Sequence, residues 1–392
     1  MDPARGAKLS TWLNDQRVRG RIYQTLLLAC VAALACGAIY NAVTNMQARG
    51  MPMGFGFWNE VAGFDINLHL ISYTNLSTYG RAFWVGLLNT LLIAVICIPL
   101  ATLLGFAIGV TRLSPNWLLS RLALVYTSIL RNIPLLLLLL FWYNAVLKSL
   151  PGPRQAISIG DVVFLDNRGL YLPMPVPREQ SVWFISAIAA ALILAAGFRE
   201  WARRRQERTG EQAPSTLVAV GLILGLPAIA SAAGGAPFGF DIAKLSGFNL
   251  KGGLQVIPEM AALVFGLVTF TAAFIAEIVR AGLLAVPVGQ SEAAAALGLH
   301  RGLTMKLVVV PQAMRLITPP LTSQYLNIVK NSSLAVFIGY PDLVQIFAGT
   351  VLNQTQAAVQ VMAITMAVYL FISLAVAVAL NLFNARYALK ER

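Results

Sequence analysis

Long runs of apolar residues constrain this chain more than any other feature. Eight runs have about the 20 residues that a helix needs to cross a bilayer. They cover approximately 22–43, 83–110, 118–147, 181–198, 216–233, 258–284, 306–337 and 359–385. Only 11% of the residues are charged, and a soluble fold of 392 residues could not bury this much apolar surface. The sequence therefore predicts an all-α integral membrane protein with about eight transmembrane helices.

Two of these regions differ from the others. The run at 306–337 contains Pro311, Pro319 and Pro320, which predicts a broken or kinked helix whose freed backbone groups face protein or a cavity. The pair of runs within 181–233 has almost no polar side chain at membrane depth. We expect this pair to form a peripheral hairpin outside any transport pathway.

The distribution of Lys and Arg predicts the orientation. Basic residues are concentrated before residue 22, at 199–208 and after residue 385, and they are sparser in the long loops 44–82 and 148–180. Because cytoplasmic loops carry the excess of positive charge, both termini are expected in the cytoplasm. The first helix is expected to remain uncleaved. The net charge of +13 lies between apolar runs, without a nucleic-acid-binding motif, so nucleic acid is not an expected partner.

The two long outer loops leave alternatives open. They are rich in Gly, Pro and aromatic residues. We expect them to form short interfacial helices or a docking surface for an external partner, and a solvated connector is the alternative. Cys30, Cys36 and Cys97 all lie in apolar runs, which does not indicate a disulfide framework.

A short polar segment, 286–302, lies between the sixth and seventh runs. Pro287 suits a first helical turn, Glu292 comes early enough to face the positive helix end, and four consecutive alanines favour helix. Gly298 is a natural left-handed stop. The segment is therefore expected to be a short, bounded helix on the cytoplasmic side. Its small side chains suit a knob that enters a partner's groove, and an ordinary helical connector is the alternative.

Several motifs in this chain resemble one family. Glu292-Ala293-Ala294 followed by Gly298 and Val310-Pro311 is similar to the "EAA" loop of the membrane subunits of ATP-binding-cassette (ABC) importers. Further similarities are to the polar amino-acid permeases of that family, in the right order and over 83–147 and 258–385. The matching segments are Gly86-Leu-Leu-Asn-Thr90, Tyr126-Thr-Ser-Ile-Leu-Arg-Asn-Ile-Pro134, Ala276-Glu-Ile-Val-Arg-Ala-Gly282 and Lys330-Asn-Ser-Ser-Leu334.

The resemblance implies a type I ABC importer permease fold with additions. Residues 1–82 would hold the cytoplasmic N-terminus, the first span and a periplasmic loop, and residues 83–147 the first part of the permease core. Residues 148–257 would be an insertion with periplasmic loops and an extra hairpin, and residues 258–392 the second part with the coupling helix 286–302. This layout resembles the enlarged permeases of general L-amino-acid and glutamate/glutamine/aspartate/asparagine uptake systems.

The resemblance also implies the partners. They are a second homologous permease forming a heterodimer, a dimeric ATP-binding subunit, a periplasmic amino-acid-binding protein and an L-amino-acid substrate, in the lipid of a Gram-negative bacterial inner membrane. The residues expected to couple to the ATPase are Gly289, Glu292, Ala293, Ala294, Gly298, His300 and Arg301. His300 is expected to cap a helix or contact a partner.

The chain itself has no sequence signature for catalysis. No lysine follows a glycine in the pattern that the phosphate-binding loop G-x-x-x-x-G-K-[ST] requires, so ATP would be used by a separate subunit. No cofactor is expected on this chain, and two histidines give no expectation of a metal site. The sequence therefore predicts a transport subunit and not an enzyme.

Polar residues inside apolar runs are candidates for a substrate pathway, because ionisable groups are costly there unless they face protein or water. Arg131 and Lys330 suit a substrate carboxylate, which favours acidic or amide amino acids. The expected substrates are L-amino acids, either polar and acidic ones or a broad range. A structural role, in which polar groups pair and lock the helices, is the alternative and is favoured for Glu277 with Arg280 one turn away. The candidate pathway residues are Asn89, Thr90, Arg131, Asn132, Glu277, Lys330, Asn331, Ser332 and Ser333.

Two other classes of protein compete with this interpretation. An ion-coupled secondary amino-acid transporter predicts inverted repeats with paired broken helices, and only the run at 306–337 is expected to be broken, with no second half that mirrors it. A membrane enzyme requires clustered carboxylates or histidines, and the acidic residues are scattered singly.

Overall fold

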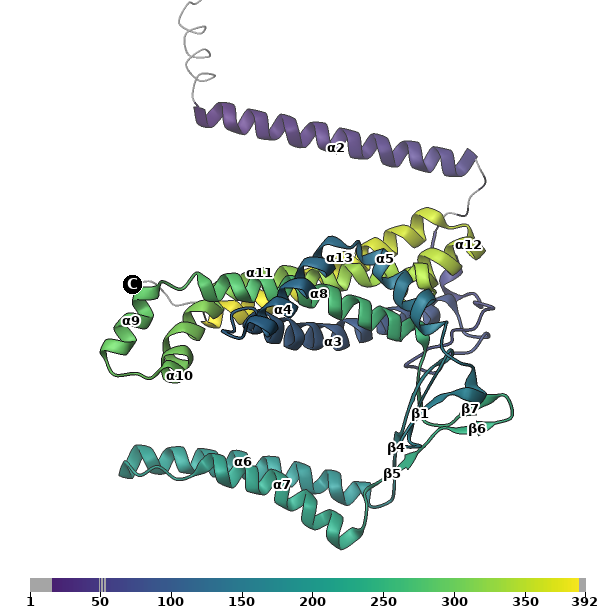
Figure 1. The fold of residues 1–392 in the computed structure, drawn as a ribbon. Helices are drawn as coiled ribbons and strands as arrows, with labels where there is room; N and C mark the ends of the chain where they lie inside the picture. Colours follow the sequence, from purple (N-terminus) through teal and green to yellow (C-terminus); the bar gives the residue numbers. More distant parts are fainter. Residues whose placement is uncertain (1–15, 49, 51, 53, 388–392) are drawn as a thin grey trace, which may run out of the picture. The chain divides into compact units, whose positions relative to one another are not determined.

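The computed structural model describes residues 16–48, 50, 52 and 54–387 (Figure 1). The predicted cytoplasmic ends lie partly outside these residues. The basic residues outside them include Arg5, Lys8, Arg49, Lys390 and Arg392. The chain forms two compact units. The first contains the described residues up to Leu92 together with Pro341–Phe383, and the second contains Ile93–Tyr340 together with the described residues after Phe383.

Most of the predicted spans are long apolar helices. They are α2 (Gln16–Ala48), α3 (Tyr79–Thr111), α6 (Ser181–Thr209), α7 (Ser215–Gly234), α8 (Pro258–Leu284) and α13 (Ala358–Tyr387). Within the described residues, six helices are long and apolar enough to span a bilayer, or seven if one bent pair counts as a span. The integral membrane class is thereby confirmed, while the count of eight and the side of the termini stay predictions.

The bent pair lies in the run at 118–147, which the sequence analysis treated as a single span. Helix α4 (Trp117–Asn132) is followed by α5 (Leu135–Leu140) and a π-helical segment η2 (Phe141–Leu147), and the two parts are bent by 106°. Pro134 explains the break, because helical geometry is disfavoured for the residue before a proline. Ile133 accordingly has φ −93° and ψ 130°.

The run at 306–337 is helical but is not broken at its internal prolines. Helix α11 (Val310–Asn331) continues through Pro319 and Pro320. Its irregularities lie at its ends, where α10 (Arg301–Thr304) passes into a π-helical segment η4 (Met305–Val309) and where α11 passes into a 3₁₀ segment η5 (Ser332–Ile338). A π-helical segment η6 (Val344–Val351) and α12 (Leu352–Thr355) then precede α13. Polar residues such as Gln312, Arg315 and Lys330 keep α11 below the apolarity of a typical span.

Helix α8 is the centre of the second unit. It packs against α11, α4, α5 and η2. Two glycines of α3 also approach it closely: a Cβ at Gly105 would lie 2.6 Å from Ile275 Cβ, and one at Gly109 would lie 2.8 Å from Ala276 O. Small residues at such contacts allow helices in a membrane to approach backbone to backbone. The Tyr126 hydroxyl adds a 2.7 Å hydrogen bond to Thr269 O between α4 and α8.

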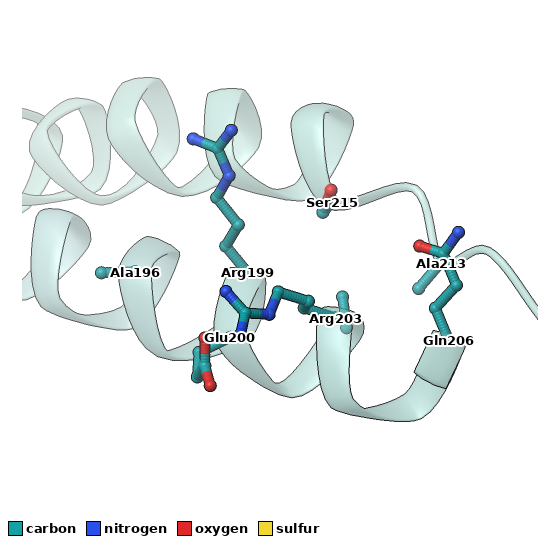
Figure 2. Close-up of a pocket in the computed structure, with 8 residues that line it drawn as sticks. Ala196, Arg199, Glu200, Arg203, Gln206, Ala213 and Ser215 are labelled. Atoms are coloured by element: carbon teal, nitrogen blue, oxygen red, sulfur yellow. The ribbon is translucent and has the colours of Figure 1, made fainter. Parts of the chain in front are cut away.

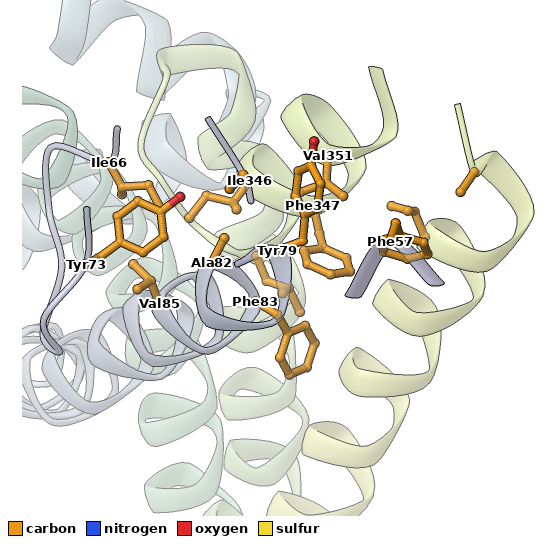
Figure 3. Close-up of a cluster of buried hydrophobic side chains, with 14 residues drawn as sticks. Phe57, Ile66, Tyr73, Tyr79, Ala82, Phe83, Val85, Ile346, Phe347 and Val351 are labelled. Atoms are coloured by element: carbon orange, nitrogen blue, oxygen red, sulfur yellow. The ribbon is translucent and has the colours of Figure 1, made fainter. Parts of the chain in front are cut away.

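The first unit contains an aromatic cluster at the start of α3 (Figure 3). Phe57, in the 3₁₀ turn η1 (Gly56–Asn59), and Tyr73 come from the loop before α3, and Phe83 and Phe347 come from α3 and η6. The Tyr73 hydroxyl donates to Phe64 O at 3.2 Å, and burial raises the pKa of Tyr73 to about 12. The loop before α3 is therefore held against the start of that helix by packed aromatic side chains.

The insertion contains strands that the sequence analysis did not anticipate. The strands β1 (Ile157–Ile159), β2 (Val163–Asp166), β3 (Gly169–Leu172) and β8 (Leu254–Val256) form an antiparallel sheet in the order β1-β2-β3-β8. Two-stranded pairs join β4 (Met174–Pro177) to β5 (Phe238–Asp241) and β6 (Lys244–Ser246) to β7 (Asn249–Lys251). Each strand has three or four residues, which is too short for a recognisable alternation of apolar and polar positions.

One carboxyl group of this sheet is buried. Asp166 is 1% exposed, and its Oδ1 accepts a 2.7 Å hydrogen bond from the Arg168 backbone N–H. Burial raises the pKa of Asp166 against the opposing effect of that hydrogen bond.

Candidate functional site

The segment predicted to contact the ATPase is a short helix, α9 (Val288–Ala296). Pro287 is its N-cap residue, one position before the first helical residue. At the other end Gly298 has φ +78°, the Gly298 N–H donates to Ala295 O at 2.9 Å, and the Leu299 N–H donates to Ala294 O at 3.1 Å. These two bonds form a Schellman motif, which ends a helix and satisfies its last carbonyls. The predicted bounded helix is confirmed.

One face of α9 is fixed to the rest of the chain and the remainder is open. Ala294 is 3% exposed, whereas Glu292 and Ala293 are exposed. Gln312 of α11 donates from Nε2 to Gln290 Oε1 at 3.1 Å, which links α9 to the following helix. A Cβ at Gly289 would have no atom within 4 Å. The helix therefore presents a surface of small side chains while one alanine and one amide hold it in place.

Two polar residues, one beside α9 and one within it, have different surroundings. His300 Nδ1 accepts a 3.4 Å hydrogen bond from the Leu303 N–H and so caps α10, which begins at the exposed Arg301. Glu292 is the fifth residue of α9 and lies beyond its first turn, which contains no acidic residue. The expected interaction of Glu292 with the positive helix end is therefore wrong, because that effect fades within the first turn.

A cluster of charged side chains from distant parts of the second unit surrounds Glu277 on α8. Its Oε2 accepts from Arg112, the residue directly after α3, and, at 3.3 Å, from Arg131 of α4, while its Oε1 accepts from Arg280 Nε at 3.0 Å. Arg131 also lies over the ring of Phe274, at 5.5 Å from its centroid. One carboxylate thus joins three helices and leaves a surplus of positive charge.

The sequence predicted the Glu277 pair with Arg280 but not the contact with Arg112. Arg112 directly follows an apolar run, yet its side chain is only 12% exposed. Arg131 is 40% exposed. A charged residue at the end of a span, level with an opposite charge on another span, is the signal that identifies such a contact.

The residues predicted at the end of α11 mostly satisfy their own turn. Ser332 is buried and donates to Val329 O at 2.8 Å, and Ser333 donates to Lys330 O at 2.7 Å. Asn331 is half-buried. Lys330 is exposed, and its side-chain ammonium has no hydrogen bond or ion pair to any residue that the structure describes. On α4, Asn132 donates to Ser128 O at 2.7 Å.

Asn89 and Thr90 lie in the first unit and connect α3 to the segment before η6. Asn89 Nδ2 donates to Leu68 O and to Pro341 O, both at 2.8 Å. Thr90 Oγ1 accepts from the Leu343 N–H at 3.1 Å and donates to Gly86 O at 2.9 Å. The predicted pathway residues therefore divide between the two units, and within the first unit both have structural bonds.

A buried carboxylate beside Asn89 and Thr90 was not anticipated. Asp342 is fully buried, and it accepts from the Gln345 N–H at 2.8 Å and from the Tyr369 hydroxyl at 3.1 Å. It is the one acidic residue between 334 and 351, so the rule for ionisable residues in spans would have found it had that segment been included. Among the described residues, no group of three side chains is placed to hold a metal ion.

The comparisons with known proteins define the class of the chain. Residues 98–389 match the family model described as "Binding-protein-dependent transport system inner membrane component". The chain belongs to this family of ABC importer permeases. Its members are transport components and not enzymes, which confirms the predicted class and argues against the ion-coupled transporter and the membrane enzyme.

Three full-length relatives narrow the assignment to permeases named for amino-acid transport. The chain is 51% identical to "Putative amino-acid ABC transporter permease protein YhdX" of Escherichia coli, over 96% of this chain and 95% of the relative. It is 44% identical to "General L-amino acid transport system permease protein AapQ" of Rhizobium johnstonii, over 97% and 95%. It is 39% identical to "Glutamate/glutamine/aspartate/asparagine transport system permease protein BztB" of Rhodobacter capsulatus, over 100% and 98%. The family resemblance drawn from the motifs is confirmed.

Proposed function

We propose that this chain is the permease through which a Gram-negative inner-membrane importer carries L-amino acids, with polar or acidic substrates favoured. Three relatives named for amino-acid transport support this, because each matches at least 95% of this chain, including the insertion. A periplasmic binding protein delivers the substrate, a second homologous permease completes the pathway, and a separate dimeric ATPase supplies the energy. Both termini lie in the cytoplasm.

The observation that carries the proposal is the construction of α9. A helix that transmits force must be rigid, attached to its own chain and open on its outer face. The Schellman motif fixes its end, Ala294 and Gln290 attach it, and the exposed face around Ala293 allows close approach of another protein. Because helices transmit displacement only through packed contacts, movement of α9 by a bound ATPase moves α10 and η4, against which α9 packs, and with them α11.

The contrast between Ala293 and Ala294 tests this coupling. Ala293→Arg places a bulky charge on the open face and should abolish uptake and substrate-stimulated ATPase activity while the permease remains folded. Ala294→Arg buries a charge within the chain itself and should reduce the yield of folded permease. Normal uptake by the Ala293 variant, at normal expression, would refute the role of α9 as the coupling element.

The exposed cations provide a test of the substrate class. Arg131→Met and Lys330→Met remove positive charge that suits a substrate carboxylate, and Lys330 has no partner among the described residues to lose. We expect Lys330→Met to lower glutamate uptake about tenfold with assembly unchanged, since one lost ionic contact corresponds to about 1.4 kcal/mol or more. The measurement is uptake of radiolabelled glutamate beside uptake of a neutral amino acid in proteoliposomes. Unchanged glutamate uptake would remove Lys330 from the pathway.

A further inference from the structure

The hairpin of α6 and α7 combines an apolar body with a basic end. The two helices pack mainly against each other, and only 17% of the apolar part of α6 and 6% of that of α7 are buried. Large apolar side chains such as Trp183, Ile193 and Leu217 are more than 70% exposed. In a membrane protein such surfaces are covered by lipid, so this hairpin is surrounded by bilayer on most of its circumference.

Helix geometry places the basic end at the level of the lipid headgroups. From Ser181 to Arg199 the helix rises about 27 Å, close to the roughly 30 Å of the hydrocarbon core. Helix α7 starts at Ser215 and is about 30 Å long by the same rise, so Ser215 and Arg199 lie at the same end of the hairpin. Trp183 and Trp201 lie near the two ends of the apolar part, where interfacial aromatic residues are expected.

A cavity lies between the two helices at this end. It has a volume of about 370 Å³, and its polar lining consists of Arg199, Glu200, Arg203, Gln206 and Ser215. Figure 2 shows the Arg199 side chain extending from α6 toward α7, while Glu200 points away from α7. The volume is within the range of pockets that hold small ligands.

The charge of this end is not balanced by its own acidic residues. Residues 199–211 contain five arginines and three glutamates. Glu200 pairs with Arg204 at 2.9 Å, Glu207 with Arg203 at 3.2 Å and Glu211 with Arg205 at 2.7 Å. Arg199 has no acidic partner within the part of the chain that the structure describes. The pair of Arg203 with Glu207 is exposed and weak, so Arg203 is free to exchange Glu207 for a stronger anionic ligand.

We propose that this cavity binds the phosphodiester headgroup of an anionic phospholipid. Guanidinium groups bind phosphate oxygens with paired hydrogen bonds, and Arg199 and Arg203 supply two of them. The Gln206 amide and the Ser215 hydroxyl add uncharged donors. A lipid fits better than a soluble phosphate because the cavity opens at headgroup depth and continues into apolar helix surface that the acyl chains cover. The bound lipid joins the inserted hairpin to the membrane independently of the substrate carried.

The test is binding of phosphatidylglycerol to the full-length permease with its co-purifying subunits, measured by native mass spectrometry in detergent. The double variant Arg199→Gln/Arg203→Gln should bind phosphatidylglycerol about 100-fold more weakly, since each lost charge-assisted hydrogen bond to phosphate weakens binding about tenfold. The matched control Arg204→Gln/Arg208→Gln removes the same charge outside the cavity and no such hydrogen bond, and in detergent without an anionic bilayer surface it should retain binding to within about threefold.

The remaining outcomes each decide against the proposal. Equal loss in the two double variants would show general attraction to a basic segment and no site. Unchanged binding in the cavity variant, with an unaltered elution profile of the complex, would show that the lipid binds elsewhere. Displacement of the lipid by inorganic phosphate, or equal binding of phosphatidylcholine, would refute recognition of an anionic lipid headgroup.

Discussion

Helices α8 and α6 are about equally apolar by sequence, but they face different surroundings. In the most apolar part of α8, 61% of the residues are buried by the chain itself, against 17% in α6. Their charges differ in the same way. Glu277 of α8 binds arginines from α4, from α8 and from the turn after α3, whereas each glutamate near the end of the hairpin binds one arginine that is no more than six residues away in sequence.

This difference shows what apolarity alone does not report. In lipid, an apolar side chain gains little by facing a neighbouring helix in place of an acyl chain, so helix association depends on close packing and polar contacts. The core of the second unit has both, through Gly105 and Gly109 and through Glu277. The hairpin has exposed arginines with local partners, which leaves them available to a ligand from outside.

The largest effect is expected for the carboxylate that joins three helices. Glu277→Gln leaves three arginines without a counter-ion and should lower the free energy of unfolding by about 3 kcal/mol, the lower end of the range for a broken buried ion pair. Thermal unfolding of the purified complex measures this, and Glu277→Asp is the conservative control. An unchanged midpoint for Glu277→Gln would show that the ion cluster does not stabilise the core.

The next effect concerns close packing. Gly109→Leu places a side chain where even a Cβ would lie only 2.8 Å from Ala276 O. Overpacking of this kind costs about 1–3 kcal/mol. Gly221→Leu on α7 is the matched control, because no atom lies within 4 Å of its Cβ position. The ratio of monodisperse to aggregated permease on size-exclusion chromatography distinguishes them. Equal behaviour of the two variants would remove the packing difference between core and hairpin.

A smaller difference separates two arginines of the same cluster. Arg112 is 12% exposed and Arg131 is 40% exposed at a 3.3 Å contact, so solvent screens the second interaction more. Arg112→Gln should cost about 2 kcal/mol, and Arg131→Gln less than about 1 kcal/mol. The two midpoints of thermal unfolding, compared under the same conditions, test this order, which the reverse result would contradict.

The smallest effect is expected at the hairpin. Glu207→Gln removes an exposed pair with Arg203 four residues earlier and should change stability by less than about 0.5 kcal/mol. By freeing Arg203 it should also strengthen phosphatidylglycerol binding slightly. A large loss of thermal stability would show that the hairpin depends on its ion pairs as the core does.

The sequence by itself determined the features that arise from neighbouring residues. The apolar runs gave the helices, and Pro287, the alanines and Gly298 gave α9 with its Schellman end, because caps and propensity act within a few residues. Four motifs in order gave the family. The apolar runs 181–198 and 216–233 gave the hairpin, since few polar side chains interrupt them.

Only the tertiary structure decided which distant residues meet. Arg112 and Glu277 are 165 positions apart, and Tyr369 of α13 reaches Asp342 in the segment before η6, so no local pattern reports either contact. Within the insertion, β3 likewise pairs with β8, although the whole hairpin lies between them in the sequence. Helix formation uses bonds within one segment, whereas ion clusters and sheets form only when segments distant in sequence come together, and that arrangement is a property of the folded chain.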